Sequence, residues 1–128
     1  MNYARNGIIL YTRNYEACVR FYRDTLGLPQ MFALDEPQSR LTCLELGGAY
    51  LMIEPDERPW PEGTTIDHLP TKLRFNVADL DAAIAELQGR GVSIARADHG
   101  WGAVADFLDP DGNACQLRSE ADFPAPRQ

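Results

Sequence analysis

The amino-acid sequence predicts an α+β fold of two repeated βαβββ modules, which form a curved mixed sheet around a cleft with the helices outside. Two observations lead to this prediction. Equivalent features recur about 65 residues apart, from Asn14 to Asp79. In each copy a strand and a helix come first, and three strand-like runs follow. A sheet with one helix has one uncovered face, so two such faces can enclose a small-molecule site.

The first strand and the helix of each copy carry clear local signals. The strands are predicted at Ile8–Tyr11 and Leu73–Val77, where apolar residues dominate or alternate. Asn14 and Asp79 stand where a helix N-cap belongs, because their side chains can accept from free backbone N–H groups. Each predicted helix has an apolar stripe and a terminal glycine. These residues are Tyr15, Val19, Tyr22, Leu26 and Gly27 in the first copy, and Leu80, Ala83, Ile84, Leu87 and Gly91 in the second.

Three strand-like runs follow each helix, and a tight glycine turn joins the last two. The runs are Gln30–Leu34, Arg40–Leu46 and Ala49–Glu54 in the first copy, and Val92–Ala97, Ala103–Leu108 and Asn113–Arg118 in the second. The sequence therefore divides into a first module at 1–54, a proline-rich linker at 55–71, a second module at 72–119 and a C-terminal tail at 120–128. Together the modules make one domain.

Composition restricts the function further. Nineteen acidic residues against twelve basic ones give a net charge of −7, which counts against general nucleic-acid binding. No apolar run approaches the length of a membrane span, and the N-terminus has no signal-peptide core. The three cysteines are scattered, as is typical of reduced thiols. We expect a cytoplasmic protein with neither nucleic acid nor membrane as partner.

Three motifs carry a family resemblance. They are FYRDTLGL at 21–28, FNVADLD at 75–81 and FLDPDGN at 107–113. With them the chain resembles the vicinal oxygen chelate (VOC) superfamily over about residues 7–119. That superfamily includes lactoylglutathione lyase (glyoxalase), extradiol dioxygenases, fosfomycin resistance enzymes and bleomycin resistance proteins. The motifs are structural, so they define the fold better than the reaction. The resemblance also implies a homodimer, with modules that pair within one chain or between two.

The resemblance implies a divalent metal, held by the first and fourth strands of each module. The matching positions are Gly7, Met52, Lys72 and Gln116. Glycine has no side chain and lysine is an ammonium ion, so we expect no cofactor and no standard metal site. Two alternatives stay open: a carboxylate ligand from Glu54, or a register slip that brings His68 toward the cleft. Otherwise His68 and His99 are expected in solvent-facing loops.

Strand alternation predicts which side chains face the cleft. Arginine and lysine there can bind a carboxylate or phosphate, and the aromatic residues suit a flat molecule. The candidate ligand-binding residues are Tyr11, Tyr50, Met52, Lys72, Arg74, Asn76, Trp101, Gln116 and Arg118. Trp60 of the linker is a further candidate at the mouth. In the alternative interpretation the cations pair with Glu45, Glu54 and Asp106 and only line a wet groove.

These observations favour a glyoxalase- or bleomycin-resistance-like protein that binds a small, anionic molecule without a metal. One alternative is a metal-dependent glyoxalase-like lyase or isomerase, or a dioxygenase, with Glu54 as the candidate catalytic base. Another is a protein–protein module whose open face only dimerises. The sequence contains no dinucleotide-binding or P-loop motif.

Overall fold

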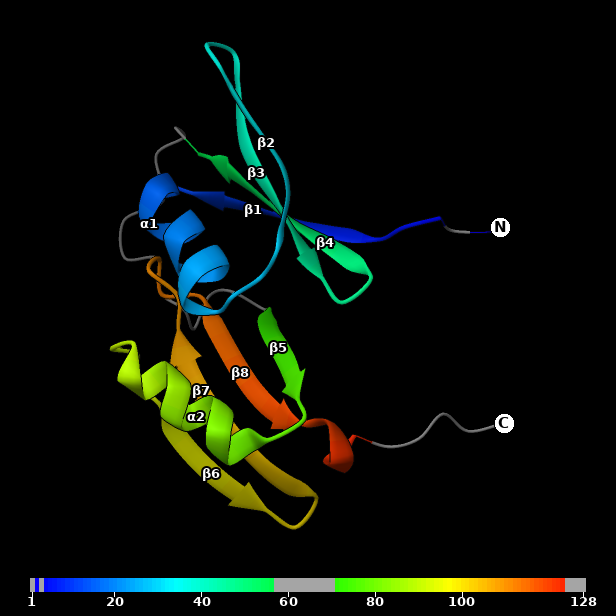
Figure 1. The fold of residues 1–128 in the computed structure, drawn as a ribbon, viewed down its shortest axis with the longest axis vertical. Helices are drawn as coiled ribbons and strands as arrows, with labels where there is room; N and C mark the ends of the chain where they lie inside the picture. The colour runs from blue at the N-terminus through cyan, green and yellow to red at the C-terminus, as the bar shows by residue number, and fades with distance from the viewer. Residues whose placement is uncertain (1, 3, 57–70, 124–128) are drawn as a thin grey trace. The chain divides into compact units, whose positions relative to one another are not determined.

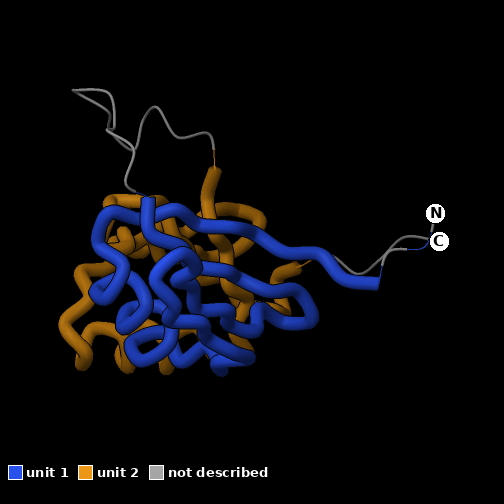
Figure 2. The backbone as a smooth tube through the Cα atoms, turned by 90° about the horizontal axis from the view of Figure 1, so that it is seen from above, with its two compact units in different colours: residues 1–62 blue, residues 63–128 orange. Residues whose placement is uncertain are grey.

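The computed structural model of the chain describes residues 2, 4–56 and 71–123. The chain divides into two compact units, residues 1–62 and residues 63–128 (Figure 2). Each unit contains one four-stranded sheet, ordered β1-β4-β3-β2 in the first and β5-β8-β7-β6 in the second (Figure 1). In both sheets the first and fourth strands of the unit pair in parallel, and the other neighbours are antiparallel. The predicted α+β fold of two βαβββ modules is confirmed.

The elements follow the predicted order. In the first unit they are β1 (Gly7–Thr12), α1 (Tyr15–Val19), the π-helical turn η1 (Arg20–Thr25), β2 (Gln30–Glu36), β3 (Ser39–Leu46) and β4 (Ala49–Pro55). In the second they are β5 (Lys72–Val77), α2 (Leu80–Gly89), β6 (Ala95–His99), β7 (Gly102–Leu108), β8 (Ala114–Ser119) and the 3-10 turn η3 (Glu120–Asp122). The middle of the predicted linker (57–70) and the end of the predicted tail (124–128) lie outside the described residues.

Each sheet packs its own helix on one face. In the first unit Leu44, Leu51 and Ile53 are fully buried together with Cys18 and Tyr22 of the helix. In the second unit Phe107 and Leu117 of the sheet, together with Leu80 and Leu87 of α2, are the equivalent buried residues. Burial of such side chains is the main stabilising contribution to each unit. Neither α1 nor α2 covers the opposite face of its own sheet (Figure 1).

The two helices begin and end differently. Asp79 caps α2 as predicted, since its carboxylate accepts from the Ala82 N–H at 3.0 Å. Asn14 is the N-cap residue of α1 as predicted, but its side chain makes no capping hydrogen bond. Instead its backbone N–H donates to the hydroxyl of the buried Thr12 at 2.9 Å. The first helix also widens into η1, where the Leu26 N–H reaches the Phe21 carbonyl at 2.9 Å.

The end of α2 explains why β6 starts later than predicted. Gly91 has φ +88°, which a C-terminal glycine adopts without strain. The next N–H, from Val92, donates to the Leu87 carbonyl at 3.0 Å. Val92 therefore belongs to the helix cap, and the strand runs over Ala95–His99 in place of Val92–Ala97.

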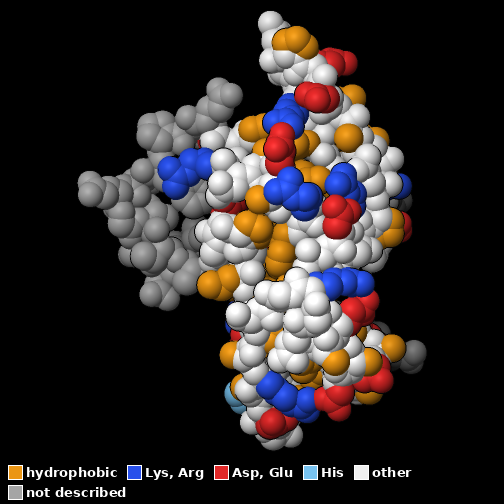
Figure 3. All heavy atoms as spheres, turned by 60° about the vertical axis from the view of Figure 1, so that its left-hand side comes forward, with side chains coloured by type: hydrophobic (Ala, Val, Ile, Leu, Met, Phe, Trp, Pro, Cys, Tyr) orange, Lys and Arg blue, Asp and Glu red, His pale blue; other side chains and the backbone are white. Residues whose placement is uncertain are grey.

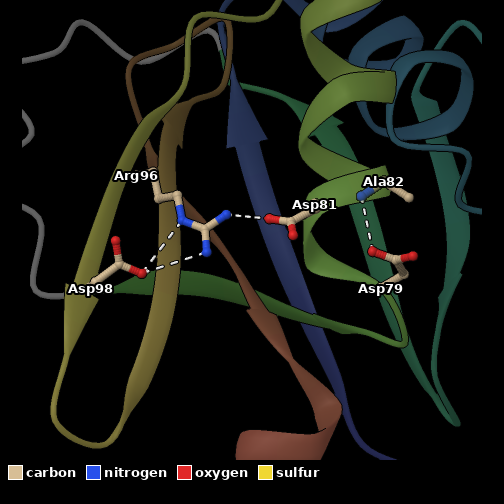
Figure 4. A network of polar contacts seen from close by, with 5 residues as sticks. All are labelled: Asp79, Asp81, Ala82, Arg96 and Asp98. Carbon is tan, nitrogen blue, oxygen red and sulfur yellow. Dashed lines mark hydrogen bonds and ion pairs between the residues drawn. The ribbon is translucent and has the colours of Figure 1, made fainter.

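A polar network ties α2 to the edge strand β6 on the helix side of the second sheet (Figure 4). Arg96 of β6 forms ion pairs with Asp81 of α2 and with Asp98, whose Oδ1 lies 3.5 Å from the Arg96 Nε. All three side chains are largely exposed, so each pair stabilises only weakly. On this side of the sheet Arg96 is thus neutralised by two carboxylates.

Candidate functional site

The open face of the second sheet collects most of the predicted ligand-binding residues. In the parallel ladder between β5 and β8, Arg74 pairs with Gln116 and Asn76 with Arg118. Paired residues share a face, and alternate residues point the same way. Lys72 therefore joins these four side chains on the face away from α2. The sequence-based assignment of their direction agrees with this register.

Gln116 is the centre of a fixed hydrogen-bond chain. Its Oε1 accepts from the Arg74 Nε at 2.7 Å, and its Nε2 donates to the Asp106 Oδ1 at 2.8 Å. The Lys72 Nζ lies 3.7 Å from the same Asp106 oxygen. Because Gln116 is only 5% exposed, its amide has few alternatives to this orientation. The chain holds the Arg74 side chain in one direction over the open face.

Arg118 is almost fully buried, at 8% exposure. One terminal nitrogen donates to the Asp122 carbonyl at 2.9 Å. The guanidinium carbon lies 4.8 Å from the centre of the Trp101 ring, which His99 also stacks on at 4.7 Å. The Arg118 Nε is buried and has no acceptor in the described part of the chain. Buried polar atoms are nearly always hydrogen-bonded, so this N–H lacks the acceptor that such a group normally has.

The three cations on this face differ in their partners. Lys72 is paired with Asp106, as the wet-groove interpretation expected. Neither Arg74 nor Arg118 has a carboxylate within 4.0 Å among residues 4–56 and 71–123. Four arginines elsewhere do have such partners, namely Arg23, Arg40, Arg90 and Arg96, whereas Arg5 and Arg20 form no ion pair with another described residue. On the surface drawn in Figure 3, basic and acidic side chains likewise lie close together.

The open face of the first sheet is apolar by comparison. The β1–β4 register places Ile9 beside Met52 and Tyr11 beside Glu54, with Tyr50 on the same face. Ile9 and Tyr11 are 49% and 45% exposed. The predicted residues Tyr11, Tyr50 and Met52 thus share one sheet, and the cationic set lies on the other. Glu54 is half-buried at the end of this face.

The residues at the implied metal positions do not fit a metal ion. A Cβ built on Gly7 would collide with the Tyr50 ring, so this ring fills the space of a ligand at that position. Gln116 already directs its only acceptor oxygen at Arg74, and the Lys72 ammonium faces Asp106. Within the described ranges no three His, Cys, Asp or Glu side chains lie together in a metal-binding group. The side chains at these four positions therefore do not provide the ligand set that a transition metal requires.

Several candidates lie elsewhere than expected or outside the described residues. Trp60 and His68 fall within 57–70, which the structure does not describe. His99, expected in a loop, is the last residue of β6 and stacks on Trp101. Burial raises the pKa of the Cys43 thiol above its ordinary value, which suits an inert cysteine.

Sequence reasoning missed the C-terminal contribution to the site. Residues 120–128 were expected to be a tail, yet Glu120–Asp122 form η3 directly after β8. Asp122 and Phe123 then contact Arg118. The signal available in the sequence was an aromatic residue, Phe123, in an otherwise polar and proline-containing segment.

The fold agrees with the family that sequence comparison finds. The chain belongs to the Glyoxalase/Bleomycin resistance protein/Dioxygenase superfamily, whose family model matches residues 4–117. The resemblance to the VOC superfamily is thereby confirmed. A relative, the uncharacterized protein YraH of Bacillus subtilis (strain 168), is 31% identical over 121 residues, which cover 86% of this chain and 93% of YraH.

Solved structures share the fold at lower identity. TnmS3, an antibiotic binding protein from Streptomyces sp. CB03234, matches with a TM-score of 0.71 and 24% identity, over 90% of this chain and 93% of that chain. Lactoylglutathione lyase from Agrobacterium tumefaciens matches with a TM-score of 0.70 and 18% identity, over 95% and 97%. One is described as a binding protein and the other as an enzyme, so the fold alone does not choose between these functions. No helix of the described residues has the length and apolar character needed to span a bilayer.

Proposed function

We propose that this protein binds a small, anionic molecule on the open face of its second sheet, without a metal ion at the family position. One observation carries the proposal. Arg74 and Arg118 share this face with Lys72, and neither arginine has a carboxylate partner in the described part of the chain. An arginine binds a carboxylate or phosphate through paired N–H donors. A buried guanidinium without a counter-charge costs free energy, and a bound anion offsets this cost.

The donor set favours binding over metal-dependent catalysis. Gly7 and Lys72 provide no metal ligand, and the Gln116 oxygen is already bonded to Arg74. The antibiotic-binding protein TnmS3 is an example of binding on the same fold. The alternative, a glyoxalase-like lyase or isomerase or a dioxygenase with Glu54 as base, requires a metal held by other residues.

Ligand titrations test the proposal. We expect benzoate or inorganic phosphate to bind the purified protein in isothermal titration calorimetry. Arg74→Gln should weaken the binding about tenfold or more, because the variant keeps a hydrogen-bonding side chain but removes the charge. Arg74 is exposed, so this change should not impair folding. The matched control is Arg90→Gln, since Arg90 is a half-exposed arginine paired with Glu86 on α2. Equal affinities for the protein and Arg74→Gln, or no binding of either anion, would overturn the proposal.

Metal analysis tests the second half of the proposal. After incubation with zinc, nickel, manganese or iron and gel filtration, we expect far less than one ion per chain by mass spectrometry. A stoichiometric ion, together with turnover of a methylglyoxal–glutathione adduct, would establish the enzyme alternative. The cytoplasmic location and the homodimer remain predictions, and sedimentation equilibrium measures the latter.

A further inference from the structure

The chain after β8 turns back onto Arg118. The turn η3 is closed by the Phe123 N–H, which donates to the Glu120 carbonyl at 3.0 Å. This turn directs the Asp122 carbonyl at the Arg118 guanidinium, 2.9 Å away. The centre of the Phe123 ring lies 5.8 Å from the guanidinium carbon. The turn therefore occupies positions around Arg118 that a bound molecule could use.

The start of β7 is shaped to accept this turn. Gly102 has φ +136°, a backbone conformation that favours glycine. A Cβ built there would lie 2.6 Å from the Asp122 Oδ2 and 3.0 Å from the Asp122 Cβ. A side chain at this position would force the Asp122 side chain to shift. The close approach of Asp122 to Gly102 is thus a second observation, independent of the Arg118 contacts, that η3 packs against the start of β7.

The groups of the turn that contact Arg118 resemble those of an aromatic carboxylate. They are one oxygen acceptor and one flat ring, carried on a segment with two carboxylates, Glu120 and Asp122. The likeness is incomplete, because the acceptor is a neutral carbonyl and the Arg118 Nε has no acceptor in the described chain. A carboxylate can accept from two guanidinium N–H groups at once and carries the opposite charge. A small aromatic carboxylate would supply both the missing acceptor and a ring in the place that Phe123 takes beside the guanidinium.

We propose that Glu120–Phe123 is an internal cap on Arg118, which a small aromatic carboxylate displaces when it binds. The inference rests on the proposed anion site and adds its ligand class and its regulation. The cap competes with the ligand for the same guanidinium. The apparent affinity therefore equals the affinity of the uncapped site multiplied by the fraction of molecules in which the cap is open. Removal of the cap should therefore strengthen binding.

A pair of truncations with benzoate as the probe tests the cap. Removing residues 120–128 should tighten benzoate binding about threefold to tenfold, because a hydrogen bond and a ring contact no longer compete. Removing only residues 124–128 is the control and should change the affinity less than twofold. Tighter binding by the longer truncation alone supports the cap. Weaker binding by the longer truncation would show that the turn is part of the site, and unchanged binding would show that it does not compete; either result overturns the proposal.

Two further measurements keep the test independent of stability. Phe123→Ala should strengthen benzoate binding about twofold to threefold, as the loss of one weak ring contact predicts. Phe32→Ala, which removes a similarly exposed phenyl ring from β2, should not. In ¹⁵N NMR spectra, benzoate should shift the Arg118 Nε–H signal more than acetate does, because acetate lacks the ring. An unshifted signal would overturn the assignment of Arg118 as the ligand contact.

The failure of the cap and the failure of the anion site can be told apart. Arg74 is not among the groups that the turn contacts, so the Arg74→Gln variant reports on the anion site alone. If Arg74→Gln weakens binding and the truncation has no effect, only the cap is wrong. If phosphate binds and benzoate binds neither the full chain nor the truncated chain, only the cap proposal is wrong. If neither anion binds either chain, both proposals are wrong.

Discussion

The two open sheet faces of this protein have the same backbone plan and opposite chemistry. Both lie on four strands in the same order, with a parallel first–fourth pair. The first face exposes apolar side chains such as Ile9, Tyr11 and Phe32. On the second face lie Arg74 and Arg118, without carboxylate partners in the described residues. The comparison teaches that the duplicated fold supplies two similar surfaces, while a few side chains decide whether a surface is apolar or cationic.

On the helix-covered faces the side chains are similar and the helix backbones differ. There the side chains are alike, because Ile53 in the first unit and Leu117 in the second hold equivalent positions beside the first strand. The backbones differ, since one helix widens into η1 and the other remains regular to Gly89. Packing thus tolerates a change of helix geometry, provided that the buried residues stay apolar and of similar volume.

The largest effect expected is on this shared core. Ile53→Ala and Leu117→Ala each remove a side chain that is at most 3% exposed. Each should lower the free energy of unfolding by about 2–5 kcal/mol, through lost burial and a new cavity. Urea denaturation measures the loss. The exposed Leu34→Ala, at 39% exposure, is the control and should cost less than about 1 kcal/mol. A small loss for only one of the two core variants would contradict the equivalence of the modules.

The helix starts should give a smaller effect. Asp79→Ala removes the side-chain cap of α2, and Thr12→Val removes the hydroxyl that accepts from the Asn14 N–H. We expect each to cost about 1 kcal/mol. Asp79→Asn, which keeps a capping oxygen, should cost only a few tenths in the same urea experiment. An unchanged free energy of unfolding in Thr12→Val would show that the Thr12 hydroxyl does not stabilise the start of α1 as Asp79 stabilises the start of α2.

The smallest effect concerns the pH dependence of an outer ion pair of the first unit. Arg23 donates to Asp24 at 2.8 Å, and this hydrogen bond lowers the pKa of the Asp24 carboxyl below its ordinary value of 3.8. The pair therefore stabilises the folded chain above that value, and the contribution is lost as the pH falls through the lowered pKa. Because Asp24 is solvent-exposed, the change in stability should be slight. A ¹³C NMR titration should give a midpoint that returns to the ordinary value in Arg23→Gln; an unchanged midpoint would refute the assigned cause.

Much of the fold could be predicted because its signals are local. The glycine ends of the helices, the Asp79 cap and the alternation of the β5 residues all arise within a few neighbouring residues. The errors arose where a distant or competing partner decided the outcome. At the start of α1 the hydrogen bond is made by the Thr12 hydroxyl and not by the Asn14 side chain. At the end of α2 the Val92 N–H bonds to the helix, so Val92 is not part of β6.

By itself, the sequence determined the repeat, the family and the direction of the site residues, because the side-chain period of a strand is fixed at two. Only the tertiary structure decided which polar groups meet. The contact between Arg74 and Gln116 joins residues that are 42 positions apart, and the bond from Gln116 to Asp106 fixes the amide between them. The return of Asp122 and Phe123 to Arg118 likewise depends on where η3 places them. Such contacts follow from strand register and chain reversal, which no short sequence pattern encodes.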